Sequence, residues 1–277
     1  MRREQTAFLL FIALASSLML SNMAVAAPIN YEYYATVADP AMLSKLKTDA
    51  NAGIAAAQYW YGTLFDPSEP VTSATQKSWA NAKYWYLKAA EQGYADAQYN
   101  LGVMYDQGQG VPQNEAEAAK WYRNAAKQGV ADAQINLGFM YDHGQGVPQN
   151  YAEAEKWYTK AAKQGVAVAQ YNLGIMYFHG QGVPQNYAEA EKWYTKAAKQ
   201  GVAVAQYNLG IMYALGYGVP QDYVQAIKWL ILAKANGKKG ADKILDDTER
   251  IAMLQQVAQA QELAKQWWDA HHPASGQ

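Results

Sequence analysis

The chain has 277 residues, of which 51% are hydrophobic, and it is rich in tyrosine (22) and tryptophan (9) but contains no cysteine. Its formal net charge of −1 argues against a surface that binds nucleic acid or another polyanion. Without cysteine the fold gains nothing from disulfides, so its stability depends on packing.

The first 26 residues have the pattern of a secretory signal peptide. Arg2 and Arg3 precede an apolar stretch over residues 7–20, and Ala24-Val25-Ala26 follows as a cleavage site of small residues. An apolar stretch of about 14 residues is too short to cross a bilayer, which takes about 20. We therefore expect residues 1–26 to be removed on export, leaving no transmembrane anchor. The expected location is the bacterial periplasm, and release to the outside is the alternative.

The sequence from about residue 50 to 240 repeats with a period of 36 residues. Three residue types mark the period: Gly102, Gly138, Gly174 and Gly210; Trp121, Trp157, Trp193 and Trp229; Pro112, Pro148, Pro184 and Pro220. A degenerate first copy begins near Ala55 and has an extended loop at 66–77. Self-similarity at such a period predicts that each copy is one supersecondary unit and that the copies stack.

Each copy is predicted to form two helices, A and B. In the second copy, helix A spans 95–107 and helix B about 115–128, because apolar residues recur on one face of each. The glycines and the proline of 108–112 cannot continue a helix. Five helix pairs result.

Helix B carries clear start and stop signals. Asn114 and Glu117 have the spacing of a capping box, which satisfies two open backbone donors at a helix N-terminus. Gly129 supplies the left-handed residue that ends the helix. The signals recur in later copies at Asn150/Glu153, Asn186/Glu189 and Asp222/Gln225, and at Gly165, Gly201 and Gly237.

A glycine inside helix A, such as Gly102, costs about 1 kcal/mol relative to alanine. We expect this glycine to allow close approach of helix B, whose Trp121 and Tyr122 rings need the space.

These units closely resemble the Sel-1-like repeat, a relative of the tetratricopeptide repeat with a longer loop between its helices. The resemblance rests on Gln98-Tyr99-Asn100-Leu101-Gly102, Gly108-x-Gly110-Val111-Pro112 and Ala118-x-x-Trp121-Tyr122-x-x-Ala125-Ala126-x-x-Gly129. It implies an all-α, right-handed α-solenoid with N- and C-terminal capping helices. It also implies an adaptor or scaffold role, with no cofactor. One exported, cysteine-rich branch is associated with β-lactam binding or hydrolysis, and the absence of cysteine argues against that branch.

The expected organisation has four parts. After the signal peptide, residues 27–240 form the solenoid with its N-terminal lead-in, 241–270 form C-terminal capping helices, and 271–277 are disordered. Asp247 or Thr248 is expected to cap the final helix. Its apolar residues are Ile251, Leu254, Ala258, Ala264 and Trp267.

Differences between copies indicate where the scaffold leaves the sequence free. The copies 151–186 and 187–222 differ at four positions: Phe178/Ala214, His179/Leu215, Gln181/Tyr217 and Asn186/Asp222. By analogy with the tetratricopeptide superhelix, helix A lines the concave wall. The predicted groove residues are Asp96, Tyr99, Val103, Asp106, Asp132, Phe139, Asp142, His143, Tyr171, Ile175, Phe178, His179, Tyr207, Ile211 and Leu215.

This groove is acidic in the early repeats and apolar or aromatic in the late ones. It predicts a protein or peptide partner, either an extended segment or an amphipathic helix, with one basic and one apolar portion. The alternative is that Tyr99, Tyr171 and Tyr207 only pack between adjacent A helices.

Two chemical sites are weaker hypotheses. His143 and His179 lie one period apart and could approach a metal ion, but a repeat spacing of about 10 Å separates them. Ser44 and Lys47 match the S-x-x-K pattern of penicillin-recognising enzymes without its companion motifs. We expect no metal and no catalytic residue. A secreted, host-directed binding protein and an envelope hydrolase or binder of β-lactam-type ligands remain the alternatives to a periplasmic adaptor.

Overall fold

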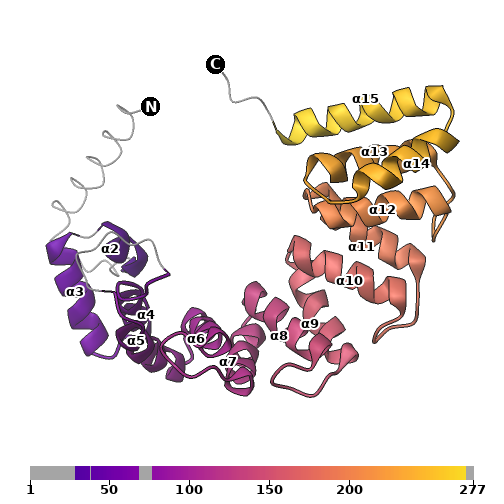
Figure 1. The fold of residues 1–277 in the computed structure, drawn as a ribbon. Coiled ribbons are helices and arrows are strands. Elements are labelled where there is room, and N and C mark those ends of the chain that lie inside the picture. The colour runs from indigo at the N-terminus through magenta and orange to yellow at the C-terminus, as the bar shows by residue number, and fades with distance from the viewer. Residues whose placement is uncertain (1–28, 38, 69–76, 273–277) are drawn as a thin grey trace, which may run out of the picture.

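The computed structural model describes residues 29–37, 39–68 and 77–272, which form an arc of stacked helices (Figure 1). Every regular element in this described part of the chain is an α-helix, and there are 14 of them. The prediction of an all-α solenoid is confirmed. The predicted signal peptide lies outside the described residues.

Five helix pairs form the body of the arc. The A helices are α4 (Ala55–Thr63), α6 (Ala95–Gln107), α8 (Ala131–His143), α10 (Ala167–His179) and α12 (Ala203–Leu215). The B helices are α5 (Trp79–Glu91), α7 (Glu115–Lys127), α9 (Tyr151–Lys163), α11 (Tyr187–Lys199) and α13 (Tyr223–Ala235). Each A helix contacts the B helix of its own pair, and from α6 onward also the B helix before it. In Figure 1, α6 lies toward the inside of the arc and α7 toward the outside.

Further helices close both ends. Before the first pair, the N-terminal lead-in consists of two helices, α2 (Tyr31–Val37) and α3 (Pro40–Asn51). After the last pair come α14 (Ala241–Ile251) and α15 (Leu254–His271). Since α14 contacts α12 and α13, it continues the A layer, and α15 packs along α13.

The prediction for the start of the final helix is wrong. Asp247 and Thr248 lie inside α14, where the Thr248 hydroxyl donates to the Ile244 carbonyl (2.6 Å). The chain instead breaks at Ala252 and Met253, and the Gln256 side chain accepts a hydrogen bond from the Met253 amide (2.9 Å). The final helix also includes His271, one residue past the predicted boundary, whereas residues 273–277 lie outside the described part.

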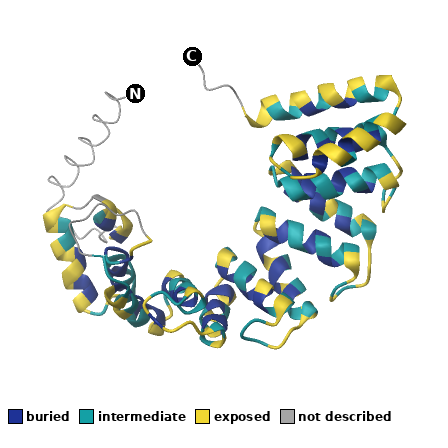
Figure 2. Ribbon diagram, viewed as in Figure 1, coloured by how far each residue is buried: buried dark blue, intermediate teal, exposed yellow. Residues whose placement is uncertain are grey.

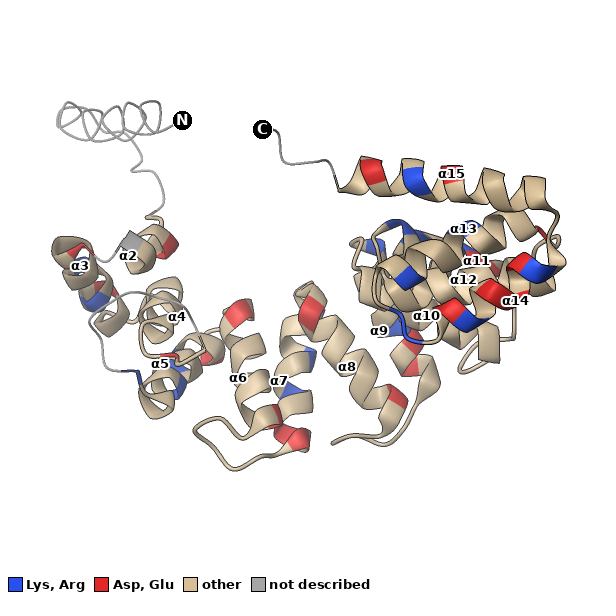
Figure 3. Ribbon diagram, turned by 45° about the horizontal axis from the view of Figure 1, so that its top comes forward, with Lys and Arg blue, Asp and Glu red and all other residues tan. Residues whose placement is uncertain are grey.

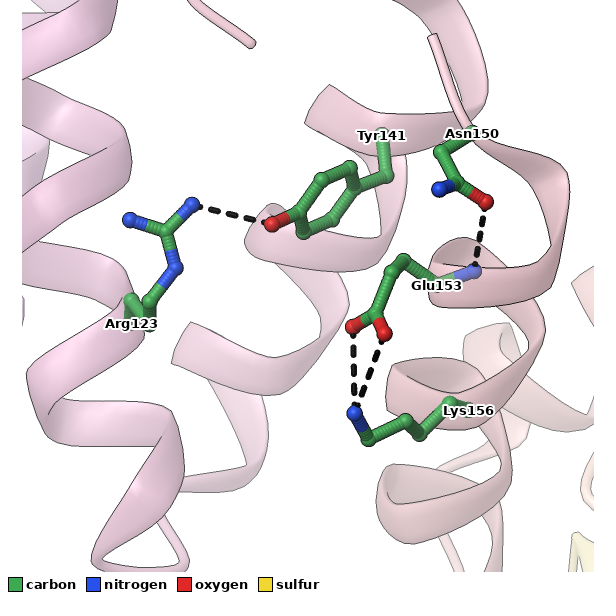
Figure 4. Close-up of polar contacts among 5 residues, drawn as sticks. All are labelled: Arg123, Tyr141, Asn150, Glu153 and Lys156. Carbon is green, nitrogen blue, oxygen red and sulfur yellow. Dashed lines mark hydrogen bonds and ion pairs between the residues drawn. The ribbon is translucent and has the colours of Figure 1, made fainter. Parts of the chain in front are cut away.

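Helix B begins as predicted, but only half of the capping box forms. The Asn150 side chain accepts a hydrogen bond from the Glu153 amide (3.1 Å), while the Glu153 carboxylate turns to Lys156 at 3.1 Å (Figure 4). The reciprocal bond is excluded because the Asn150 amide already donates to the Tyr141 carbonyl (2.8 Å). The Asn150 amide, which the capping box would pair with the Glu153 side chain, is therefore satisfied by a carbonyl of helix A.

The core repeats with the sequence. One fully buried tyrosine from helix B occupies each of four successive pairs: Tyr86, Tyr122, Tyr158 and Tyr194. A Cβ atom added at Gly102 would lie 2.5 Å from Cδ1 of Tyr122. The predicted close approach at this glycine is confirmed for the tyrosine ring, whereas Trp121 is not among its nearest neighbours. Buried residues lie where the helices of neighbouring layers meet (Figure 2).

A ladder of glutamine side chains joins consecutive repeats. The buried Gln134 amide donates to the Ala126 carbonyl (3.1 Å), and its oxygen accepts from Gln164 (2.8 Å). Gln164 also donates to the Gly129 carbonyl (3.0 Å). The same side-chain pairing occurs at Gln58/Gln92, Gln98/Gln128, Gln170/Gln200 and Gln206/Asn236. Carbonyl groups at and just past the ends of these helices therefore accept further hydrogen bonds across the repeat boundary.

Candidate functional site

The A and B layers differ in charge. None of α4, α6, α8, α10 and α12 contains a lysine or an arginine, whereas each B helix contains at least two. Figure 3 shows acidic residues on α6 and α8 and basic residues on α7 and α9. The A-helix layer therefore offers carboxylates and apolar groups but no positive charge except from histidine.

The acidic part of this layer comes from α6 and α8. Asp96 and Asp132 are exposed in the first turns of the two helices, and Asp106 and Asp142 are half-buried near their last turns. Among the described residues, none of the four forms an ion pair with lysine or arginine.

Burial raises the pKa of Asp106 and of Asp142 above the usual carboxyl range. Asp106 accepts a long hydrogen bond from the Tyr122 hydroxyl (3.4 Å), and Asp142 faces Nδ1 of His143 at 3.8 Å. These contacts do not compensate the two carboxylates for their lost hydration. A cation that bound beside them would therefore be attracted by both.

The apolar part begins with a cavity of ≈ 300 Å³ between α10 and α12. It is lined by Tyr171, Ile175, Phe178, His179, Tyr194, Asn208 and Ile211. Five of these residues belong to the predicted groove, and the structure brings them together. This first cavity is aromatic on the α10 side, and Tyr194 of α11 contributes from beneath.

A second cavity of ≈ 310 Å³ lies between α12 and α14. Its walls are Ile211, Ala214, Leu215, Gln221, Tyr223, Ile244, Asp247, Thr248 and Ile251. Ile211 belongs to both cavities, which are therefore neighbours on one surface. Leu215 is 58% exposed and Ile251 is 67% exposed, so large apolar side chains at this end of the arc face solvent.

The other predicted groove residues line neither cavity. These are Asp96, Tyr99, Val103, Asp106, Asp132, Phe139, Asp142, His143 and Tyr207. Tyr99 packs on Tyr122, with ring centroids 5.9 Å apart, and Nζ of Lys238 lies 4.8 Å from the centre of the Tyr207 ring. Phe139 is 43% exposed and stacks on His143 with centroids 4.0 Å apart.

The three tyrosines differ in their contacts. Tyr99 contacts the Tyr122 ring of α7 and Tyr207 contacts Lys238, and neither lines a cavity. Tyr171 touches the Tyr194 ring of α11 (5.9 Å between centroids) and also lines the first cavity.

Several residues line the cavities although the sequence does not predict them there: Tyr194, Asn208, Gln221, Tyr223, Ile244, Asp247, Thr248 and Ile251. Ile251 stands 36 residues after Leu215, so the repeat period extends through α14. This period is the signal in the sequence that α14 lies in the A layer. There it lines the second cavity and also closes the end of the solenoid.

The weaker chemical hypotheses gain no geometric support. Across residues 29–37, 39–68 and 77–272, no three His, Asp or Glu side chains gather as metal ligands. Ser44 and Lys47 are both exposed on α3. No helix in the described ranges is long and apolar enough to span a membrane.

Comparison with known proteins identifies the family to which these repeats belong. A family model described as "Sel1 repeat" matches residues 55–94, 95–130, 131–166, 167–202 and 203–238. A Sel1 repeat protein from Oxalobacter formigenes is 34% identical with a TM-score of 0.72, over 87% of this chain and 96% of that one. No curated protein matches the sequence.

A protective antigen present in uropathogenic Escherichia coli strains, which displays an SLR fold, is 37% identical with a TM-score of 0.70 over 82% of this chain. The alignment covers 48% of the antigen, so this chain spans about half the length of that relative.

Proposed function

The chain belongs to the Sel1 repeat family, whose members are generally scaffolds for protein–protein interaction, and we propose that it binds a segment of a partner protein along the A-helix layer. The observation that carries this proposal is the composition of that layer. Carboxylates on α6 and α8, which form no ion pair with lysine or arginine in the described part of the chain, are followed by two apolar cavities beside α12. A segment with a basic portion and an apolar portion complements both.

The energy of such an interface would come mainly from the apolar end. Large apolar side chains that leave water for well-shaped cavities dominate binding energies, whereas exposed charges chiefly set orientation and association rate. Asp96, Asp106 and Asp142 should contribute more than the exposed Asp132, because burial raises the pKa of these three carboxyl groups and they are therefore already partly desolvated.

The test is affinity capture from envelope extract with the purified chain as bait. We compare the wild type with Ile211→Asp, with the double variant Asp106→Lys and Asp142→Lys, and with a control, Lys163→Glu, which reverses an exposed charge on α9. Wild type and control should retain the same protein, and both groove variants should lose it while keeping their helical circular dichroism. Equal retention by all four would refute the proposal.

We further propose that the protein acts in the periplasm, on the support of the pattern in residues 1–26. A second candidate location, the cell exterior, is favoured by the likeness to the protective antigen. The two locations are distinguished by fractionating the cells that naturally produce the protein and detecting it in each fraction with an antibody to the mature chain. Recovery in the osmotic-shock fluid supports the first location, and recovery in the culture supernatant or on intact cells supports the second.

A further inference from the structure

The exposed residues of three consecutive B helices carry charge of one sign only. In α9 they are Ala152, Lys156, Lys160 and Lys163. The same four positions are the exposed ones in α7 and α11, where they again hold alanine and lysine, apart from Asn124 in α7. None of the exposed residues in these three helices is acidic. We call the eight lysines at these positions the lysine face.

The lysine face points directly away from the core. Two residues turn an α-helix by about 200°. In α9, Lys156 stands two residues before the buried Tyr158, and Lys163 stands two residues after the buried Ala161. Lysine and core residues therefore lie on opposite sides of the helix, and the repeat places the same arrangement on α7 and α11.

The carboxylates of these helices leave most of the lysines unpaired. The glutamates are half-buried and lie beside the face. Glu191 accepts hydrogen bonds from the Thr195 hydroxyl (2.9 Å) and the Tyr213 hydroxyl (3.1 Å), so it is directed toward the next A helix. Near the start of each helix one glutamate pairs with one lysine, as Glu153 does with Lys156 (3.1 Å). Among the described residues the rest of the face forms no ion pair: Lys127, Lys160, Lys163, Lys196 and Lys199.

Aromatic contacts hold some of these lysines without neutralising them. Nζ of Lys196 lies 3.9 Å from the centre of the Trp193 ring, and the corresponding distance on α9 is 4.1 Å. An aromatic face attracts an ammonium group but carries no net charge. Burial lowers the pKa of Lys228 on α13, and the charge of Lys199 lowers it further. The positive potential of the lysine face therefore reaches the neighbouring helix.

The net charge of the chain does not reveal this face. The total of −1 sums carboxylates and lysines that lie on different surfaces. Figure 3 shows acidic residues on α6 and α8, apart from the basic residues of α7 and α9. The expectation that no surface binds a polyanion rests on the total, so it does not follow for the outside of the B layer.

The composition of the lysine face favours a membrane over a protein. Protein interfaces are depleted of lysine and take most of their energy from aromatic, methionine or arginine anchors. Binding of single-stranded nucleic acid also uses exposed aromatic rings, for stacking. The exposed residues here include none of these, and Trp157 beneath them is only 4% exposed. Clusters of about four to eight lysines on helices are typical of proteins that bind anionic phospholipid, where each charge near the surface strengthens binding roughly fivefold.

We propose that the lysine face docks on a membrane rich in anionic phospholipid. The ammonium groups lie among the lipid phosphates, and no side chain enters the hydrocarbon, because alanine is the only apolar type among these exposed residues. The A-helix layer remains open to a partner protein. This inference goes beyond the proposed function and does not depend on it.

The test is co-sedimentation of the purified chain with phospholipid vesicles. One kind of vesicle contains phosphatidylglycerol and phosphatidylcholine in equal parts, and the other contains phosphatidylcholine alone. The face variant replaces one unpaired lysine in each helix: Lys127→Gln, Lys163→Gln and Lys199→Gln. The matched control removes the same charge from exposed lysines elsewhere: Lys47→Gln, Lys243→Gln and Lys265→Gln. All proteins are purified from the same producing cells, so that their N-termini are alike.

The wild type should bind the anionic vesicles and not the neutral ones, and its binding should weaken as salt rises, because salt screens exposed charges. The loss of three lysines should weaken binding to the anionic vesicles by about 10-fold or more. The control and Ile211→Asp should bind them like the wild type. Circular dichroism checks that every variant keeps its helices.

The inference is overturned if the wild type binds neither kind of vesicle or both equally, or if the face variant and the control lose the same affinity. Duplex DNA and polyglutamate are offered in separate arms. Tighter binding of either one than of the anionic vesicles, lost in the face variant, would show that the lysine face takes a different polyanion and would also overturn the inference. None of these outcomes affects the proposed function, which protein capture with the A-layer variants decides separately.

Discussion

The ring of Tyr158 lies against Gly138 so closely that a Cβ atom added at Gly138 would be 2.8 Å from Cδ1 of the ring. Tyr158 is itself 1% exposed, so its ring is enclosed by the fold. The same glycine–tyrosine contact joins the two helices of other repeats, so the distance between A and B helices is fixed by the absence of one side chain.

Gly138→Ala is therefore expected to destabilise the protein. Helix propensity alone predicts a gain of about 1 kcal/mol, whereas overpacking against the buried ring costs about 1–3 kcal/mol. Urea unfolding measures the result. Ala152→Gly, at an exposed position of α9, calibrates propensity. A more stable Gly138→Ala protein would contradict the packing account, and the cost should shrink when Tyr158 is also changed to alanine.

Gln134→Leu should cost about 1–3 kcal/mol, because it removes two buried side-chain hydrogen bonds, one to the Ala126 carbonyl and one from the Gln164 amide. Gln134 is 3% exposed, so water cannot easily replace the lost bonds. Gln259→Leu, at an exposed position of α15, serves as the control. Equal melting temperatures for the two variants would show that the glutamine ladder does not stabilise the repeat boundary.

The half-formed capping box predicts unequal effects at its two ends. Asn150→Ala should destabilise by about 1 kcal/mol, since the Glu153 amide loses its acceptor. Glu153→Ala should change stability by only a few tenths of a kcal/mol, because its carboxylate makes just an exposed pair with Lys156. Thermal unfolding of both variants decides the matter, and equal losses would mean that a reciprocal capping bond forms in solution.

Asp142 predicts a characteristic pH dependence. Burial raises the pKa of Asp142 in the folded chain, so its protonated form favours folding. This contribution is complete below the unfolded carboxyl pKa of about 4 and is lost as pH rises through the higher folded value. His143, which faces the carboxylate, acts in the opposite direction when it is charged.

Asp142→Asn removes this loss, so the variant should be no more stable than wild type below about pH 4 and more stable at neutral pH. Urea unfolding at several pH values measures the difference, with Asp269→Asn, exposed on α15, as a control for the lost charge. The same variant should bind a basic partner more weakly. A variant that is less stable than wild type at neutral pH would mean that the carboxylate serves the fold and is not held ready for a cation.

The sequence predicted the helix boundaries well where local chemistry determines them. Helix A at 95–107 agrees with α6 because Gly108, with φ 69°, ends it. The final helix was misplaced because Asp247 and Thr248 resemble capping residues, yet in the fold Thr248 is buried in α14 and bonds its own helix. Whether such a residue begins a helix or continues one depends on tertiary packing that local pattern does not contain.

The candidate site was predicted only in part, for a similar reason. Residues on one face of α10 share a helix, so their spacing alone places Tyr171, Ile175 and Phe178 together. The second cavity needs α14 as its far wall. Asp246 stands 36 residues after Gly210, where the repeat has its helix-A glycine, and this difference favours an end cap over a further A helix. Contacts from a different layer, such as that of Tyr194, require the packed structure.

Site-specific crosslinking tests the central claim, that the A-helix layer receives the partner, most directly. The chain has no cysteine, so one introduced cysteine can carry a photo-crosslinker without side reactions. His179→Cys places it at the mouth of the first cavity, and Lys163→Cys places it on the exposed side of α9. In envelope extract, the label at 179 should give one crosslinked protein that excess unlabelled chain competes away and that Ile211→Asp abolishes, whereas the label at 163 should not. Identical products from both positions would contradict the account.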